Sequence, residues 1–100
     1  MLRLDLPEGF VWDEGNAFKS RRTHGVTPAE AEQVFFNDPL LIVEDVKHSG
    51  AERRWQALGK TNADRSLHVT FTLRGGETKL RVISARDMSR RERAIYAEEA

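Results

Sequence analysis

The side chains best suited to chemistry in this 100-residue chain are arginines, and most of them lie in its second half. Residues 53–93 carry 11 Lys and Arg against 4 Asp and Glu, whereas residues 1–52 carry 5 against 10. Nine of those eleven cations are Arg, whose planar fork of donors matches a phosphate group. The zero net charge therefore hides a basic half, which indicates an anionic partner such as RNA or DNA. An ordinary solvated sheet face would carry the same charges.

Arg81 is the best-placed phosphate ligand in the basic half. It stands between Leu80 and Val82, so a strand that buries those two side chains turns Arg81 toward the open face of its sheet. Arg54 begins the predicted strand 54–60 and could share that face. Arg81 could instead be a plain surface arginine. Arg54 could instead form an ion pair with a nearby glutamate.

Proton transfer near neutral pH calls for histidine, glutamate or a lysine with a perturbed pKa. His24 falls in the last turn of a predicted helix, where the dipole favours its cation and where it could simply cap the helix. His68 lies on the polar face of a predicted strand, and His48 falls in a turn that we expect to be exposed to solvent. Glu52 is a candidate base if it lies close to Arg54, although a nearby cation lowers the pKa of a carboxyl group and weakens it as a base.

The sequence contains no pattern typical of a metal site. It has no Cys, its three His are far apart, and no His-x-x-x-His pair or cluster of Asp and Glu occurs. Glu44 and Asp45 are adjacent on a predicted strand, so their side chains would point to opposite faces. We therefore expect neither a metal nor another cofactor.

No segment predicts a membrane span. The longest apolar run, at 39–43, is far shorter than the ~18 residues that a span requires, and it fits a buried strand. The N-terminus lacks the basic-then-apolar plan of a signal peptide. We expect a soluble cytoplasmic protein with no membrane partner.

Local signals place two helices before a group of strands. Asp13 and Thr27 each provide a helix N-cap, and Thr27 is followed by Pro28 and by Glu30 of a capping box. Gly25 provides the left-handed end of the first helix. Beyond the second helix the apolar spacing changes from that of a helix to that of a strand.

The expected elements form an α+β domain. In order, they are a short strand at 10–12, helices at 13–24 and 27–37, strands at 40–46, 54–60, 67–74 and 79–84, and a C-terminal helix that begins at 89. Gly75-Gly76 is typical of a two-residue hairpin turn. We expect one domain over residues 1–100, with a loosely ordered stretch at 1–9 and a three- to four-stranded antiparallel sheet.

Short motifs spread over most of the chain point to one known family. The early ones are Phe10-Val-Trp-Asp13, Asn16, Lys19, His24-Gly-Val26, Ala29-Glu-Ala-Glu32 and Val34-Phe-Phe36. The later ones are Glu52-Arg-Arg-Trp-Gln-Ala-Leu-Gly59, Arg65-Ser-Leu67, Phe71-Thr-Leu-Arg74, Arg81-Val-Ile-Ser-Ala-Arg86, Glu92 and Tyr96. Together they resemble BrnT-type toxins. The part most specific to that family is the ordered set Trp-Asp, His-Gly-Val and Arg-Val-Ile-Ser-Ala-Arg. Ser20 and Thr23 depart from the pattern, which often has Asn and Lys there, so a role of that lysine is not carried over.

The resemblance implies the toxin of a type II toxin–antitoxin system, with a fold of the RelE-like superfamily. Such proteins are small ribonucleases that stop translation and slow growth. The implied partner is a BrnA-like ribbon-helix-helix antitoxin, which covers the toxin and binds the promoter of the operon. Promoter DNA is therefore expected only through the antitoxin complex.

Under this resemblance the chemistry is RNA cleavage without a metal, because the 2′-hydroxyl of RNA can attack the adjacent phosphorus. The protein must orient that hydroxyl, assist proton transfer and stabilise charge on the phosphoryl oxygens. The candidate catalytic residues are His24, Glu52, Arg54 and Arg81. The candidate RNA-binding residues are Lys19, His68, Arg74 and Arg86.

Two other functions fit the same residues. A non-catalytic module that binds nucleic acid or protein needs only the arginine-rich face, and salt-sensitive binding without cleavage would favour it. A DNA-binding regulator is disfavoured, because the second predicted helix carries Glu30 and Glu32 and no Lys or Arg.

Overall fold

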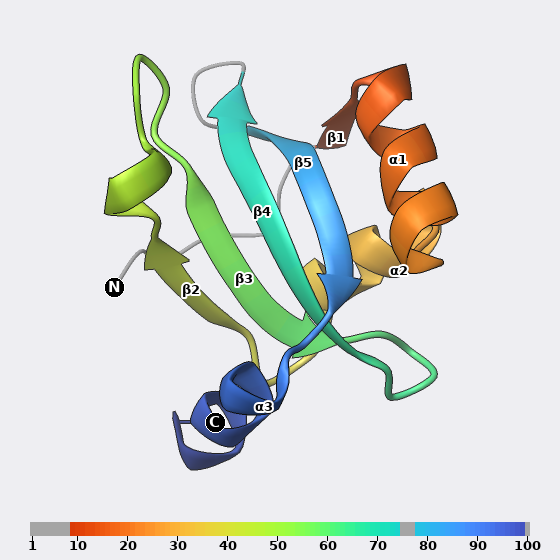
Figure 1. Cartoon of the computed structure of the whole chain (residues 1–100), viewed down its shortest axis with the longest axis vertical. Coiled ribbons are helices and arrows are strands. Elements are labelled where there is room, and N and C mark those ends of the chain that lie inside the picture. The colour runs from red at the N-terminus through yellow and green to blue at the C-terminus, as the bar shows by residue number, and fades with distance from the viewer. Residues whose placement is uncertain (1–8, 75–77, 100) are drawn as a thin grey trace.

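One five-stranded sheet organises the molecule. In the computed structural model, which describes residues 9–74 and 78–99, the strand order is β1-β5-β4-β3-β2 (Figure 1). The strands are β1 (Gly9–Trp12), β2 (Leu41–Glu44), β3 (Trp55–Lys60), β4 (Ser66–Arg74) and β5 (Lys79–Asp87). Neighbours from β2 to β5 pair antiparallel, as expected, and β1 adds a fifth strand parallel to β5.

The helices leave much of one sheet face uncovered. They are α1 (Glu14–His24), α2 (Pro28–Gln33) and α3 (Arg90–Glu99), with short 3-10 turns η1 (Val34–Phe36) and η2 (Val46–His48). In Figure 1, α2 lies behind the sheet, α1 lies beside β5, and α3 crosses the front near its lower end. The front is called the open face below. In the described part of the chain, no helix is long and apolar enough to cross a membrane.

The core lies between the sheet and the α2–η1 segment. Leu67, Val69 and Phe71 alternate along β4 and are completely buried on this side, as the spacing predicted. They pack with Val34 and Phe35, and the rings of Phe35 and Phe71 lie edge to face with centroids 5.1 Å apart. Burial of each such side chain stabilises the fold by roughly 1.5–3 kcal/mol. The opposite pleat of the same strands is thereby left on the open face.

The capping signals are confirmed. The side chain of Asp13 accepts hydrogen bonds from two backbone N–H groups of the first turn of α1, and Gly25 ends that helix with φ of 65°. Thr27 and Glu30 form both hydrogen bonds of the capping box before α2. These caps fix where α1 begins and ends, and so which of its side chains lie beside β5.

Several element boundaries differ from the prediction. The second helix gives way to η1 after Gln33, and the strand expected at 40–46 covers only Leu41–Glu44. It stops there because the side chain of Asp45 accepts a hydrogen bond from the backbone N–H of His48 and begins η2. Gly9, expected at the end of a loosely ordered stretch at 1–9, instead begins β1. The rest of that stretch and the expected hairpin turn at 75–76 lie outside the described ranges.

Candidate active site

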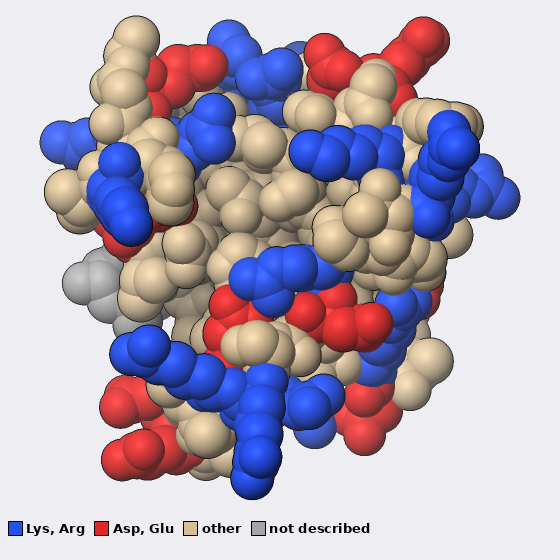
Figure 2. Space-filling view, in the orientation of Figure 1, with Lys and Arg blue, Asp and Glu red and all other residues tan. Residues whose placement is uncertain are grey.

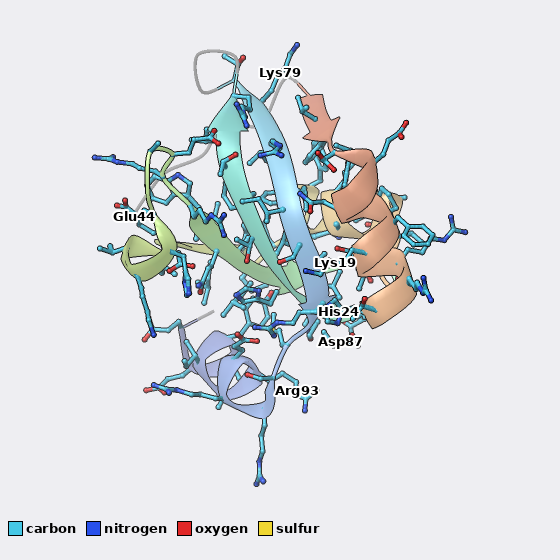
Figure 3. The ribbon with its side chains drawn as sticks, turned by 45° about the horizontal axis from the view of Figure 1, so that its top comes forward. Lys19, His24, Glu44, Lys79, Asp87 and Arg93 are labelled. Carbon is cyan, nitrogen blue, oxygen red and sulfur yellow. The ribbon has the colours of Figure 1, made fainter. Side chains whose placement is uncertain are left out.

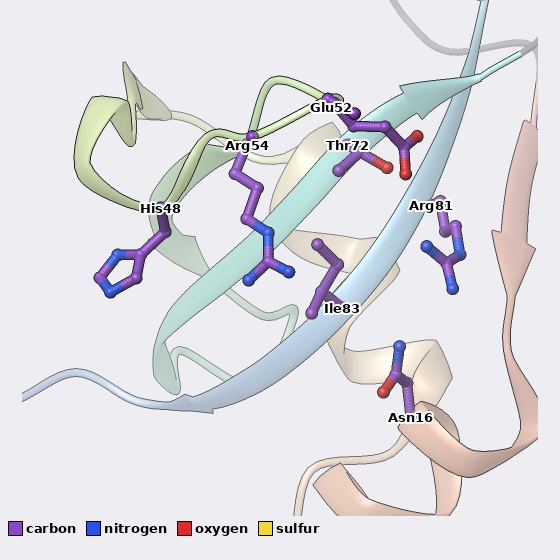
Figure 4. A pocket seen from close by; sticks show the side chains of 9 residues that line it. Asn16, His48, Glu52, Arg54, Thr72, Arg81 and Ile83 are labelled. Carbon is purple, nitrogen blue, oxygen red and sulfur yellow. The ribbon is translucent and has the colours of Figure 1, made fainter.

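A pocket of about 440 Å³ opens on the open face between η2, the β4–β5 pair and α1 (Figure 4). It is called the arginine pocket below. Side chains that line it include Asn16, His48, Glu52, Arg54, Thr72 and Arg81. Figure 2 shows Lys and Arg side chains on several sides of a central hollow on this face.

Arg54 and Arg81 reach the pocket from different segments. Arg81 pairs with Thr72 across the β5–β4 ladder, and the burial of its neighbours Leu80 and Val82 turns it outward, as predicted. Its guanidinium lies 3.7 Å from the Asp13 carboxylate, which is too long for a hydrogen bond.

Arg54 precedes β3 in the segment that leads from η2. Among the described residues, its guanidinium has no hydrogen bond or ion pair, and it points over the pocket in Figure 4. Two cations thus lie on one concave surface, and one of them is unpaired within the described chain. That arrangement suits a phosphate group.

Thr72 adds a second unsatisfied group. Only 2% of its surface is exposed, and its hydroxyl oxygen has no hydrogen-bond partner among the described residues. Leaving a buried hydroxyl unpaired costs about 1–3 kcal/mol.

Glu52 lines the pocket but is already paired. Its carboxylate accepts a hydrogen bond of 3.2 Å from Arg74, at the end of β4. Arg74 itself is not among the residues that line the pocket. The predicted pairing of Glu52 with a cation is therefore found, but its partner is Arg74 rather than Arg54.

His68 and Arg86 lie in a separate cluster beneath α3. The Arg86 guanidinium donates two hydrogen bonds, of 2.7 and 2.9 Å, to the Glu92 carboxylate. His68 lies 3.7 Å from the same carboxylate. Burial lowers the pKa of His68, and the positive charge of Arg86 lowers it further. The structure thus keeps His68 and Arg86 outside the arginine pocket, because α3 supplies a carboxylate that holds them.

The hydrogen bonds from Arg86 outweigh burial and lower the pKa of Glu92 from its usual 4.5 to about 2. Replacing Glu92 with Gln should lower the free energy of unfolding by about 1–2 kcal/mol at pH 7, while Gln still caps α3 at Ser89. A folded-state pKa below the unfolded one stabilises the fold above pH 4.5, and this contribution is lost as the pH falls toward 2. The difference in the free energy of unfolding between the wild type and Glu92→Gln should therefore shrink as the pH falls from 4.5 toward 2.

Urea unfolding at pH 7, 4 and 2.5 measures this difference. Glu98→Gln, an exposed change on the same helix, is the matched control and should alter stability by less than about 0.5 kcal/mol. A Glu92→Gln cost that stays constant down to pH 2.5 would contradict the assignment.

His24 and Lys19 also lie outside the pocket lining. Figure 3 places both on α1 beside the lower end of β5, near Asp87. The main-chain oxygen of His24 accepts a hydrogen bond of 3.2 Å from Arg65, so this end of α1 is part of a structural junction. The structure therefore does not bring the expected acid–base histidine to the arginines.

Three polar side chains of the pocket were not among the candidate site residues: Asn16, His48 and Thr72. Thr72 alternates with the apolar side chains of β4, and this signal places it on the face of Arg81. His48 was expected to be exposed in a turn, which is correct, but nothing local indicates that the turn borders the pocket. In the described part of the chain, no three His, Asp or Glu side chains come together as metal ligands.

Comparison with known families identifies the chain's relatives. Residues 12–92 match the family described as "Ribonuclease toxin, BrnT, of type II toxin-antitoxin system". The chain belongs to the BrnT family. The matched residues include every side chain of the arginine pocket named above. The BrnT family consists of ribonuclease toxins, so an RNA substrate and an antitoxin partner follow from membership.

A solved structure shows the same fold. The chain is similar to the crystal structure of the ribonuclease toxin BrnT of Brucella abortus, with a TM-score of 0.62 and 25% identity. The match covers 82% of this chain and 97% of that one. No curated protein matches the chain. The α+β fold and the resemblance to BrnT-type toxins that the sequence indicated are thus confirmed.

Proposed function

We propose that this BrnT-family protein is a metal-independent endoribonuclease whose reaction takes place in the arginine pocket. The observation that carries the proposal is the convergence of two guanidinium groups on one cavity, where that of Arg54 has no hydrogen bond or ion pair within the described chain. Thr72, which pairs with Arg81 across the β4–β5 ladder, lines the same cavity. Arg81 and Arg54 would bind the two non-bridging phosphoryl oxygens.

The proposed reaction is an internal transesterification. The 2′-oxygen of a ribose bonds to the adjacent phosphorus, and the bond from phosphorus to the 5′-oxygen breaks. Negative charge develops on the phosphoryl oxygens, where guanidinium donors stabilise it more strongly than water would. Glu52 is a candidate base, and Arg74 would hold it or contact RNA at the rim. Lys19, His24, His68 and Arg86 lie elsewhere, and the proposal gives them no step.

Incubation of the purified protein with RNA in excess EDTA tests the activity. We expect fragments that end in a 2′,3′-cyclic phosphate and begin with a 5′-hydroxyl, detected by mass spectrometry of a defined oligonucleotide. A matched oligonucleotide with a 2′-deoxyribose at the scissile position should stay intact. Intact RNA at ample protein concentration, together with salt-sensitive binding, would instead support the non-catalytic binding module.

The biological setting is proposed from the family. The protein would inhibit translation in the cytoplasm by cutting RNA, and a BrnA-like ribbon-helix-helix antitoxin would neutralise it. Promoter DNA would be bound only by the antitoxin complex. The presence of a gene for a small ribbon-helix-helix protein next to this one would support that partner.

A further inference from the structure

We propose that His48, oriented by Asp45, accepts the proton of the 2′-hydroxyl in the arginine pocket. This inference rests on the proposed function and assigns a proton-transfer residue to the same site. Both oxygens of the Asp45 carboxylate lie within hydrogen-bond distance of Nδ1 of His48, at 3.0 and 3.1 Å. A carboxylate at Nδ1 fixes the ring and leaves Nε2 free to accept a proton, as in other Asp–His pairs.

The Asp45 carboxylate is itself held in place. Its side chain is only 10% exposed, and it also accepts a hydrogen bond of 3.2 Å from the backbone N–H of His48. Burial raises the pKa of Asp45, but hydrogen bonds from Gln56 and His48 outweigh this and lower it overall. The carboxylate is therefore ionised at neutral pH and can stabilise the imidazolium that proton uptake creates.

The same loop ties His48 to Arg54. The hydroxyl of Ser49 donates to the main-chain oxygen of Asp45 at 2.7 Å and accepts from the backbone N–H of Arg54 at 2.9 Å. The backbone N–H of Asp45 donates to the main-chain oxygen of Arg54 at 2.8 Å. Three hydrogen bonds thus fix the distance between the dyad and a phosphate-binding arginine. The imidazole is 60% exposed and lies at the rim beside Arg54 (Figure 4), where a ribose could reach it.

The other candidates fit proton acceptance less well. The Glu52 carboxylate is engaged by Arg74, and His24 lies outside the pocket lining. The charged groups that share the pocket lining with His48 are Glu52, Arg54 and Arg81, and Asp45 contacts its ring.

In the proposed reaction His48 takes up one proton and later releases it. As the 2′-oxygen bonds to phosphorus, its proton passes to Nε2, and the departing 5′-oxygen takes a proton from water. The imidazolium then returns its proton to the resulting hydroxide. The products are a 2′,3′-cyclic phosphate and a 5′-hydroxyl, and His48 ends neutral.

Kinetics of His48→Gln test the assignment, with Lys47→Gln as the matched control in the same turn. We expect His48→Gln to lower kcat by about 10²–10⁴-fold with KM changed little, and Lys47→Gln to cleave at the wild-type rate. The limb of the wild-type pH–rate profile that reports ionisation of the base should be absent in His48→Gln.

A second readout does not depend on activity. Long-range ¹H–¹⁵N NMR of the folded protein should show neutral His48 protonated at Nδ1, and Asp45→Asn should lose this preference. Protonation at Nε2 in the wild type would overturn the proposal, as would full activity of His48→Gln beside an inactive Arg81→Ala. If the wild-type protein cleaves no RNA at all, the proposed function and this inference both fall.

Discussion

Replacing Arg81 with Ala should lower the rate of RNA cleavage by about 10²–10³-fold while the protein stays folded. The side chain is about a quarter exposed and lies in the arginine pocket, so its donors are available to a phosphoryl group. Its ion pair within the described residues, with half-exposed Asp13 at 3.7 Å, contributes at most about 1 kcal/mol to stability. The loss should therefore appear in kcat rather than in the unfolding transition.

Arg53→Ala is the matched control, because it removes the same charge one residue from Arg54. The Arg53 side chain is 75% exposed, and its ion pair within the described residues is a long one of 3.7 Å with Glu44. We expect Arg53→Ala to keep cleavage within about threefold, the small change typical of exposed charges screened by salt. Initial rates on a defined oligonucleotide, measured with Arg81→Ala and Arg53→Ala at equal salt, show whether the loss of cleavage is specific to Arg81. If both variants cleave at the same rate, Arg81 does not contact the reacting phosphate.

Replacing Arg65 with Ala should lower the free energy of unfolding by about 2–3 kcal/mol, the cost expected when charged hydrogen bonds are lost. The guanidinium donates to both oxygens of Asp87, at 2.7 and 3.1 Å, and to Glu30 at 3.2 Å. It also donates to the main-chain oxygens of Gly25 and His24, at 2.9 and 3.2 Å. One side chain thus joins the end of α1, the start of α2 and the end of β5.

Arg65→Lys should recover only part of that loss, because an ammonium group cannot reproduce the planar fork. Hydrogen bonds from Arg65 lower the pKa of Asp87, so the contribution holds above the ordinary carboxyl pKa of about 3.9 and is lost at lower pH. Urea unfolding at pH 7 and pH 3 measures both effects. Cleavage per folded molecule should not change, and a cost below about 0.5 kcal/mol would show that the junction is not structural.

The fold could be predicted because its signals are local. Caps at Asp13 and Thr27 and the alternation along β4 appear in the sequence within a few residues of where they act. The strand β2 ends earlier than its apolar pattern predicted. The hydrogen bond from the backbone N–H of His48 to the Asp45 side chain forms a 3-10 turn in a segment whose sequence also suits a strand. The parallel pairing of β1 with β5 joins residues about 70 positions apart, and no local pattern encodes it.

The candidate site was only partly predictable, because arginines with different partners look the same in a sequence. Arg81 could be placed on the open face from its alternation with Leu80 and Val82 alone. Whether an arginine is engaged depends on carboxylates that tertiary contacts supply. Arg86 is held by Glu92 of α3, and Arg65 by two acidic side chains from distant segments. Arg54 is left without such a partner among the described residues, and only the folded chain distinguishes it.

The hydrogen bonds of Ser49 hold together a loop that can open while the rest of the protein stays folded. The hydroxyl joins the two sides of a loop that carries both His48 and Arg54, yet the loop contributes nothing to the buried core. Segments with few buried contacts open at lower free energy than core strands. Local opening of this loop would separate His48 from Arg54 while the sheet stayed folded. Heat or mild denaturant should therefore abolish RNA cleavage below the midpoint of global unfolding.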